Sequence, residues 1–180
     1  FSFDSIRSYF SRNQHEQVIQ KEFSIAPPAT LTIQNQNGTV TINEWHRNSL
    51  QLKATKRAPK PEFLNQMQIQ VSTTDKTITI VTKQKSAKSK CSVDYELIVP
   101  KSMHVNVTTK QGAIALNNLS APLTASTKRG NIEIRNTNST VKATTQHGSI
   151  VIANAAGPVQ ANVHHGNITI ENASKSVVAQ

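Results

Sequence analysis

Apolar and polar residues alternate over much of this 180-residue chain, and from residue 105 onward the alternating pattern recurs every 18 residues. One apolar residue in two is the period of a β-strand with one buried face. The repeating unit reads V-x-A-x-T-x-x-G-x-I-x-I-x-N-x-x-x-x. Its glycines are Gly112, Gly130, Gly148 and Gly166, and its asparagines are Asn118, Asn136, Asn154 and Asn172. Each unit therefore predicts two short strands, joined by a tight turn at the glycine and by a four-residue turn after the asparagine.

Two strands and two turns per unit predict one rung of a coil. Stacked rungs lie about 4.8 Å apart, and each strand bonds in parallel to its copies above and below. Like side chains then stack, isoleucine on isoleucine and valine on valine. The expected fold is all-β, a parallel β-solenoid with 18-residue rungs over residues 105–180. We expect the asparagine column to point inward and to join the rungs through its amides, because a buried amide has to be satisfied.

The first hundred residues carry a weaker pattern. Residues 31–48 repeat the rung spacing once, and residues 66–83 hold two alternating stretches around a turn, which predicts a hairpin. We expect residues 15–104 to form an irregular or antiparallel β region that caps the solenoid at its N-terminal end, because an uncapped edge invites association. Both regions are expected to form one continuous domain, and an open C-terminal edge would allow self-association.

Three shorter segments complete the N-terminal half. Residues 1–14 show no clear period, and we expect a mobile segment or a short helix there. Residues 55–62 are polar and contain prolines, which predicts a loop, and residues 83–90 predict a second, basic loop. Cys91 is the single cysteine, so an intramolecular disulfide is excluded, and its apolar neighbours predict a partly buried thiol.

Some of these motifs occur together in a known order. They are Leu31-x-Ile33-x-Asn35-x-Asn37-Gly38-x-Val40-x-Ile42, then Tyr95-Glu-Leu97-Ile-Val99-Pro100 and Val105-Asn-Val107, then the G-x-I-x-I-x-N rungs. This order resembles the bacterial putative-adhesin family, a domain of unknown function in cell-envelope proteins, over roughly residues 15–180. The resemblance implies a β-solenoid and an exported or membrane-attached protein, and it carries no catalytic residues over to this chain.

The chain is strongly basic. Lysine and arginine outnumber aspartate and glutamate by 20 to 10, which gives a formal net charge of +10 at pH 7. Such an excess attracts polyanions such as anionic lipid, acidic wall polymer or nucleic acid, although a basic surface can also serve solubility alone. Because the sequence starts at Phe1 rather than at methionine, we expect that a preceding segment was removed. The expected location is the cell envelope, periplasm, cell surface or extracellular space.

Stacking of the rungs brings one set of polar side chains together along the glycine turn. The set is Lys110, Lys128, Arg129, His147, His164 and His165. We interpret it as a candidate anion-binding ridge, whose histidines gain charge as the pH falls through about 6.5. Two other interpretations stay open: a divalent-metal site made of the three histidines, and an exposed turn that tolerates any polar residue.

A second candidate is a pair of basic loops that could clasp a polyanion. The residues are Lys53, Lys56, Arg57 and Lys60 in the first loop and Lys83, Lys85, Lys88 and Lys90 in the second. Stacking aromatic side chains, which nucleic-acid-binding surfaces usually add, are not interleaved with these residues. The sequence therefore favours anionic lipid or a wall polymer over nucleic acid.

The rungs lack the groups that catalysis needs. A β-helix enzyme that cleaves carbohydrate uses paired carboxylates about 5–9.5 Å apart, whereas the rungs contain only Glu133 and Glu171, two rungs from each other. The sequence has no phosphate-binding loop, nucleophile motif or cysteine pair, so we expect no catalytic residue, cofactor or bound metal.

The sequence thus favours a non-enzymatic cell-envelope scaffold or adhesin-like binding module that presents a rigid surface to an envelope component or another protein. A polyanion-binding module is the first alternative, and a β-helix enzyme acting on polysaccharide is the second.

Overall fold

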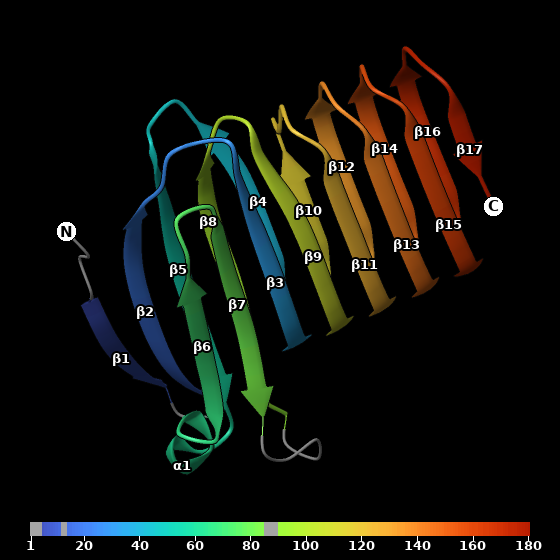
Figure 1. Ribbon diagram of the computed structural model, residues 1–180. Helices are drawn as coiled ribbons and strands as arrows, with labels where there is room; N and C mark the ends of the chain where they lie inside the picture. Colours follow the sequence, from blue (N-terminus) through green and yellow to red (C-terminus); the bar gives the residue numbers. More distant parts are fainter. Residues whose placement is uncertain (1–4, 12–13, 85–89) are drawn as a thin grey trace.

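The computed structural model describes residues 5–11, 14–84 and 90–180, whose strands form two facing sheets (Figure 1). Sheet A contains, in spatial order, β1 (Ser5–Ser11), β2 (Gln14–Ser24), β5 (Ser49–Ala58), β8 (Ser92–Pro100), β4 (Val40–Trp45), β10 (Ile114–Asn117), β12 (Ile132–Thr137), β14 (Ile150–Ala155) and β16 (Ile168–Ala173). Sheet B contains β17 (Val177–Ala179), β15 (Val159–His165), β13 (Val141–His147), β11 (Leu123–Arg129), β9 (Met103–Gln111), β3 (Ala29–Asn37), β7 (Thr77–Gln84) and β6 (Met67–Thr73). A short helix, α1 (Pro61–Leu64), joins β5 to β6.

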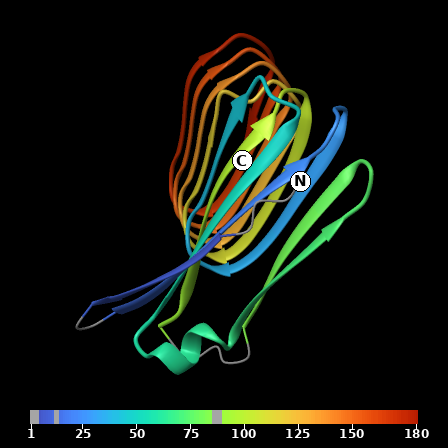
Figure 2. The ribbon, with the colours of Figure 1, turned by 90° about the vertical axis from the view of Figure 1, so that its left-hand side faces the viewer.

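From β9 onward the chain is a coil in which each turn adds one strand to sheet B and the next strand to sheet A. Every strand pairs in parallel with its copy 18 residues away. Successive partners in sheet A are Ile114, Ile132, Ile150 and Ile168, and in sheet B Val105, Leu123, Val141, Val159 and Val177. Seen from the N-terminal end, the coils lie one behind another (Figure 2). The predicted parallel β-solenoid with 18-residue rungs is confirmed.

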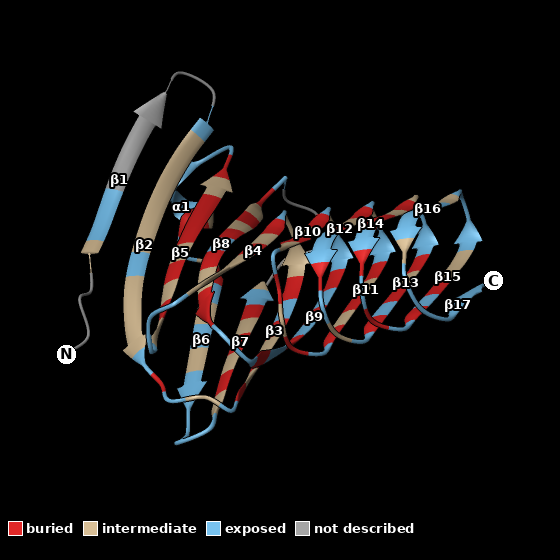
Figure 3. Cartoon of the chain, turned by 90° about the horizontal axis from the view of Figure 1, so that it is seen from above, coloured by how far each residue is buried: buried red, intermediate tan, exposed pale blue. Residues whose placement is uncertain are grey.

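The core lies between the sheets. Along the strands, buried residues alternate with more exposed ones, which gives the banded colouring of Figure 3. Ile132 and Ile150 from sheet A and Val141 from sheet B are fully buried. Because burying one such side chain contributes about 1.5–3 kcal/mol, the ladders of the core are the main source of stability in each rung.

Each coil passes from sheet B to sheet A at a glycine. Gly130 and Gly148 have φ angles of +150° and +142°, a conformation that residues with a Cβ rarely adopt. A Cβ at Gly148 would also lie 2.1 Å from the carbonyl oxygen of Gly130 in the preceding coil. The Gly130 N–H donates a hydrogen bond to the carbonyl of His147 at 2.9 Å. The glycine corner is therefore a closely stacked edge, with backbone hydrogen bonds between adjacent coils.

Each coil leaves sheet A at an asparagine, and here the structure corrects the prediction. The four asparagines of the column have φ angles between +52° and +58°, a left-handed conformation that asparagine tolerates better than most residues. The turn directs their side chains outward, and the next residue, such as Thr137 or Ala155, is buried instead. The expected inward orientation is wrong. The exposed amides still bond in series: Asn136 donates to Asn118 at 3.0 Å, Asn154 to Asn136 at 2.9 Å and Asn172 to Asn154 at 3.0 Å.

The N-terminal part continues the coil by one rung and then becomes antiparallel. β3 pairs in parallel with β9, and β4 with β10. Beyond them, β2, β5 and β8 pair antiparallel in sheet A, and β6 and β7 form a hairpin at the edge of sheet B. The predicted antiparallel β cap is confirmed. Across its core, the buried hydroxyl oxygens of Tyr95 in β8 and Thr82 in β7 lie 2.6 Å apart and share a hydrogen bond that links the two sheets.

Two segments differ from the sequence-based expectation. Ser5–Ser11, expected to be mobile or helical, form β1, an edge strand that pairs with β2. Its Ile6 is 64% exposed, and the sequence of the strand shows no regular apolar period. Residues 55–62, expected to be a loop, contain the end of β5 and the start of α1. Pro61 suits the first turn of a helix, where its missing N–H is not needed.

No helix among the described residues is long and apolar enough to cross a membrane.

Candidate functional site

The charged residues are divided unequally between the two sheets. The strands of sheet B, all of which the structure describes, contain five lysines and arginines, four histidines and no aspartate or glutamate. The five cationic residues are Lys83, Lys110, Lys128, Arg129 and Lys142, and the histidines are His104, His147, His164 and His165. All nine side chains are exposed. Sheet B therefore presents positive charge that no carboxylate on its own strands balances.

Sheet A carries charges of both signs. Its described strands hold seven carboxylates and six lysines or arginines. The carboxylates are Glu16, Glu22, Glu44, Asp94, Glu96, Glu133 and Glu171, and the cationic residues are Arg7, Lys21, Lys53, Lys56, Arg57 and Arg135.

Several of the charged residues of sheet A are paired. Lys53 Nζ lies 3.0 Å from Glu96 Oε1, and Arg135 pairs with Glu133. Arg57 Nε lies 2.7 Å from Glu16 Oε1, and the guanidinium also pairs with Asp94. The hydrogen bond to Glu16 is the largest cause that raises the pKa of Arg57. Sheet A thus balances its own charge, in contrast to sheet B.

The six residues of the predicted anion-binding ridge lie along the glycine corner, in two columns. Arg129, His147 and His165 are successive partners on adjacent coils. Lys110, Lys128 and His164 come one residue earlier in their coils and belong to the neighbouring column, in which Gln146 stands between Lys128 and His164. Partners on adjacent strands are about 4.8 Å apart. The structure therefore brings all six side chains to one edge, where they line up rather than converge on one point.

The three histidines interact as rings. The centroids of His147 and His165 are 4.9 Å apart with an interplanar angle of 11°, so the two rings are stacked. The ring of His164 is tilted by 35° from that of His165, at a centroid distance of 6.1 Å. Across the described residues, no group of three or more His, Cys, Asp or Glu is arranged to hold a metal ion. This geometry disfavours the alternative of a divalent-metal site.

Most residues assigned to the first basic loop lie in a strand instead. Lys53, Lys56 and Arg57 lie in strand β5, with Lys53 and Arg57 paired to carboxylates. Lys56 is only 9% exposed, and burial lowers its pKa. Lys56 occupies an inward position of β5, where the alternating pattern would place an apolar residue, so the sequence suggests a loop there. Lys60 Nζ lies 3.9 Å from Glu62. Lys83 and Lys90 are exposed, whereas Lys85 and Lys88 lie outside the described residues.

The sequence analysis named the six residues along the glycine corner, but it did not recognise the wider set of basic and histidine residues on the outer side of sheet B to which they belong. His104 and Lys142 lie on the same sheet as the ridge and were not singled out. The signal that could have found them is in the repeat itself. From residue 105 onward, the V-x-A-x-T strand of the unit carries no carboxylate, whereas the I-x-I-x-N strand carries Glu133 and Glu171. Glu133 lies in β12 and Glu171 in β16, and β14 lies between these two strands in sheet A.

Several solved structures of bacterial proteins are similar to this chain at low sequence identity. No protein-family model matches the sequence, and no curated protein matches it. One similar structure is a putative cell adhesion protein from Clostridium sporogenes ATCC 15579, with 10% identity and a TM-score of 0.45 over 99% of this chain and 98% of that chain. A putative adhesin from Bacteroides fragilis NCTC 9343 has 13% identity and a TM-score of 0.33 over 91% of this chain and 97% of that chain. One from Parabacteroides merdae ATCC 43184 has 8% identity and a TM-score of 0.29 over 91% and 96%.

Proposed function

We propose that this protein is a non-enzymatic, adhesin-like binding module of the cell envelope, and that it binds a phosphate-bearing polyanion of the envelope along sheet B and the glycine corner. One observation carries the proposal. The strands of sheet B hold five lysines and arginines and, within the described chain, no carboxylate, while sheet A of the same coil is close to neutral. An exported location, in the envelope or outside the cell, is part of the proposal.

The glycine corner holds its cations at a fixed spacing. The N–H groups of Gly112 and Gly130 donate to the carbonyls of Arg129 and His147 on the next coil, both at 2.9 Å. These bonds order the backbone before any ligand arrives. Binding therefore needs little further ordering of the backbone, and more of the interaction free energy remains as affinity.

Repulsion within the face favours an anionic ligand. Lys110 and Lys128 hold equivalent positions on adjacent coils, and like charges on neighbouring strands destabilise each other. A polyanion relieves this repulsion, and each lysine or arginine near an anionic membrane surface contributes about 1 kcal/mol of binding. The described strands of sheet B contain no Trp, Tyr or Phe on which a base could stack, which favours lipid headgroups or wall polymer over nucleic acid.

The test compares two sources of phosphate: vesicles of phosphatidylcholine with phosphatidylglycerol, and soluble poly(glycerol phosphate). Binding is measured at low and at high salt for the wild type and for the triple variant Lys110→Gln, Lys128→Gln, Arg129→Gln. Removing three cations should weaken binding by about 3 kcal/mol at low salt, roughly a hundredfold. High salt should weaken the wild type because it screens exposed charges. The probe that binds more tightly identifies the source of the phosphate.

The matched control removes three cations from sheet A, with Arg7→Gln, Lys53→Gln and Arg135→Gln. Both variants lower the net charge by the same amount, so a difference between them reports the face and not the total charge. Equal weakening in both variants contradicts the proposal, as does wild-type binding that salt leaves unchanged. Tighter binding to single-stranded DNA than to either phosphate probe also contradicts it.

A further inference from the structure

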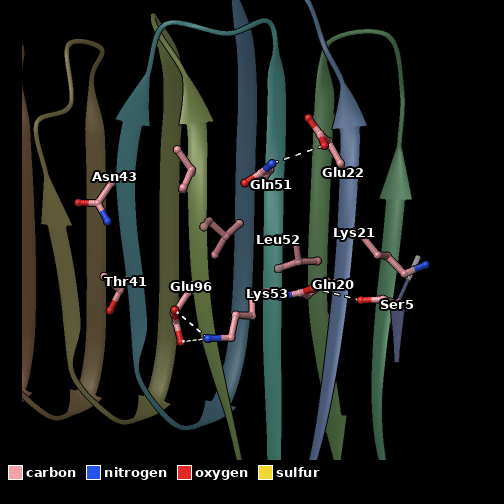
Figure 4. A pocket seen from close by; sticks show the side chains of 12 residues that line it. Ser5, Gln20, Lys21, Glu22, Thr41, Asn43, Gln51, Leu52, Lys53 and Glu96 are labelled. Carbon is pink, nitrogen blue, oxygen red and sulfur yellow. Dashed lines mark hydrogen bonds and ion pairs between the residues drawn. The ribbon is translucent and has the colours of Figure 1, made fainter. Parts of the chain in front are cut away.

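A hollow of about 450 Å³ lies on the outer face of sheet A, away from the cationic face (Figure 4). It extends over β1, β2, β5, β8 and β4, which are neighbours in the sheet. Strand pairing aligns its side chains in two rows that cross the strands. One row is Asn43, Ile98, Gln51 and Glu22, and the other is Thr41, Glu96, Lys53 and Gln20.

The charges in the hollow balance each other. Two lysines and two glutamates line it. Lys53 Nζ lies 3.0 and 3.2 Å from the two carboxylate oxygens of Glu96. Glu22 accepts hydrogen bonds from the Ser49 hydroxyl at 2.8 Å and from the Gln51 amide at 3.5 Å. The carboxylates are thus engaged within the protein, and the hollow has no excess charge to attract a phosphate polymer.

Uncharged polar groups remain for a ligand. Within the described chain, the half-buried side chains of Thr41 and Asn43 make no hydrogen bond to the protein. Gln20 accepts a hydrogen bond from Ser5 at 3.1 Å through its oxygen, which leaves its NH₂ group available. Gln51 donates through its nitrogen, which leaves its oxygen available. Donors and acceptors therefore surround an apolar patch at Ile98, which is half-buried.

The position of the hollow restricts the class of ligand. It lies on the face of a sheet whose backbone N–H and C=O groups are used in the strand ladders, so a peptide cannot add to it as a further strand. Recognition must come from the side chains. Hydroxyls, amides and one apolar patch match the hydroxyl groups and the apolar C–H faces of a sugar ring.

We propose that this hollow binds an uncharged oligosaccharide, with successive sugar units laid along the two rows across the strands. Each row places four side chains on neighbouring strands at steps of about 4.8 Å, close to the length of one sugar unit in an extended chain. The site uses other residues and other chemistry than the polyanion-binding face of sheet B.

The test is an array of immobilised uncharged oligosaccharides that contain hexoses, N-acetylhexosamines and deoxyhexoses, followed by titration calorimetry with the tightest binder. The test variant Asn43→Ala, Gln51→Ala should bind at least tenfold more weakly. The matched control is Asn106→Ala, Gln160→Ala. Both residues are exposed on sheet B, in β9 and β15, away from the hollow. The control should bind as the wild type does.

Failure to bind any uncharged member of the array overturns the proposal, and so does equal loss in both variants. If Asn43→Ala, Gln51→Ala unfolds at a lower temperature than the wild type, the single variant Thr41→Ala replaces it, with the same expected direction. Binding should not change with salt and should persist in Lys110→Gln, Lys128→Gln, Arg129→Gln. Loss of sugar binding in that triple variant would show that the sugar binds on sheet B, which contradicts the proposal. The sugar-binding test does not depend on polyanion binding, so the two proposals can fail separately.

Discussion

Sheets A and B, which from β9 onward are wound from alternate strands of one coil, share one core, yet their outer surfaces differ. On the inner side they are equivalent: Ile132 from sheet A and Val141 from sheet B are both fully buried. On the outer side, sheet A carries paired charges such as Lys53 and Glu96, whereas the strands of sheet B carry no carboxylate in the described chain. The comparison teaches that winding fixes the inward residues and the corner residues of a solenoid, but not the outward residues of its strands. Its two outer faces are free to acquire different partners.

Both faces depend on the same winding of the chain. We therefore expect the largest loss of folding stability from a substitution at the glycine corner. Gly148→Ala would place a Cβ 2.1 Å from the Gly130 carbonyl oxygen at a φ of +142°. We expect a loss of roughly 4 kcal/mol in the free energy of unfolding, measured by urea denaturation, because a clash adds to backbone strain. Ser149→Ala, at the next residue, is the control and should change stability by less than about 0.5 kcal/mol. A Gly148→Ala protein as stable as the wild type would contradict the stacked corners.

The next effect concerns the hydrogen bond that links the two sheets in the cap. Burial raises the pKa of Tyr95 to about 12, against the opposing effect of the hydrogen bond with Thr82. The folded protein therefore holds this proton more tightly than the unfolded chain does. The resulting stability is complete below about pH 10 and is lost as the pH rises from about 10 through 12.

Tyr95→Phe tests this link. Between about pH 10 and 12, the free energy of unfolding of the wild type should fall more steeply than that of the variant, by up to about 1.4 kcal/mol per pH unit. At pH 7 the variant should lose about 1 kcal/mol, because the buried Thr82 hydroxyl loses its partner. The measurement is denaturant unfolding at a series of pH values. Parallel pH profiles for the two proteins would show that Tyr95 is not buried as described.

A third effect is expected at the asparagine corner, which returns each coil from sheet A to sheet B. Asn154 has a φ of +58° and bonds through its amide to Asn136 and Asn172. Asn154→Ala loses both the amide bonds and the tolerance of that φ, and should cost about 1–2 kcal/mol. Asn154→Gly keeps the tolerance of φ and should cost less. If thermal unfolding ranks the two variants in the opposite order, the left-handed turn is not what selects asparagine.

Much of the fold was predictable, because the residues that stack on adjacent coils must be alike and therefore recur in the sequence. Ile114, Ile132 and Ile150 recur at the spacing of one coil, and stacking requires them to be alike. The outward turn at Asn154 was not predictable from alternation, since a single left-handed residue changes the side to which the following residues point. β1 was missed for another reason. It pairs with β2 along its whole length, and backbone pairing requires no apolar period in the sequence.

The candidate site was predictable only in part. The ridge followed from the repeat, because Lys128 and His147 occupy the same corner on adjacent coils. The pairing of Lys53 and Arg57 with carboxylates was not predictable, since these carboxylates come from strands distant in the sequence. The hollow on sheet A was not foreseen at all. Its rows join side chains from β2, β4, β5 and β8, and the sequence does not say which of these strands are neighbours.

The difference between the two faces can be measured most directly by lysine acetylation, followed by mass spectrometry, with and without bound phosphatidylglycerol vesicles. We expect Lys110, Lys128 and Lys142 of sheet B to be protected in the bound state. Lys101 and Lys175 are exposed outside the strands and serve as internal references that should react as in the free protein. Protection of all five lysines to the same extent, or protection of the two references alone, would contradict a binding face on sheet B.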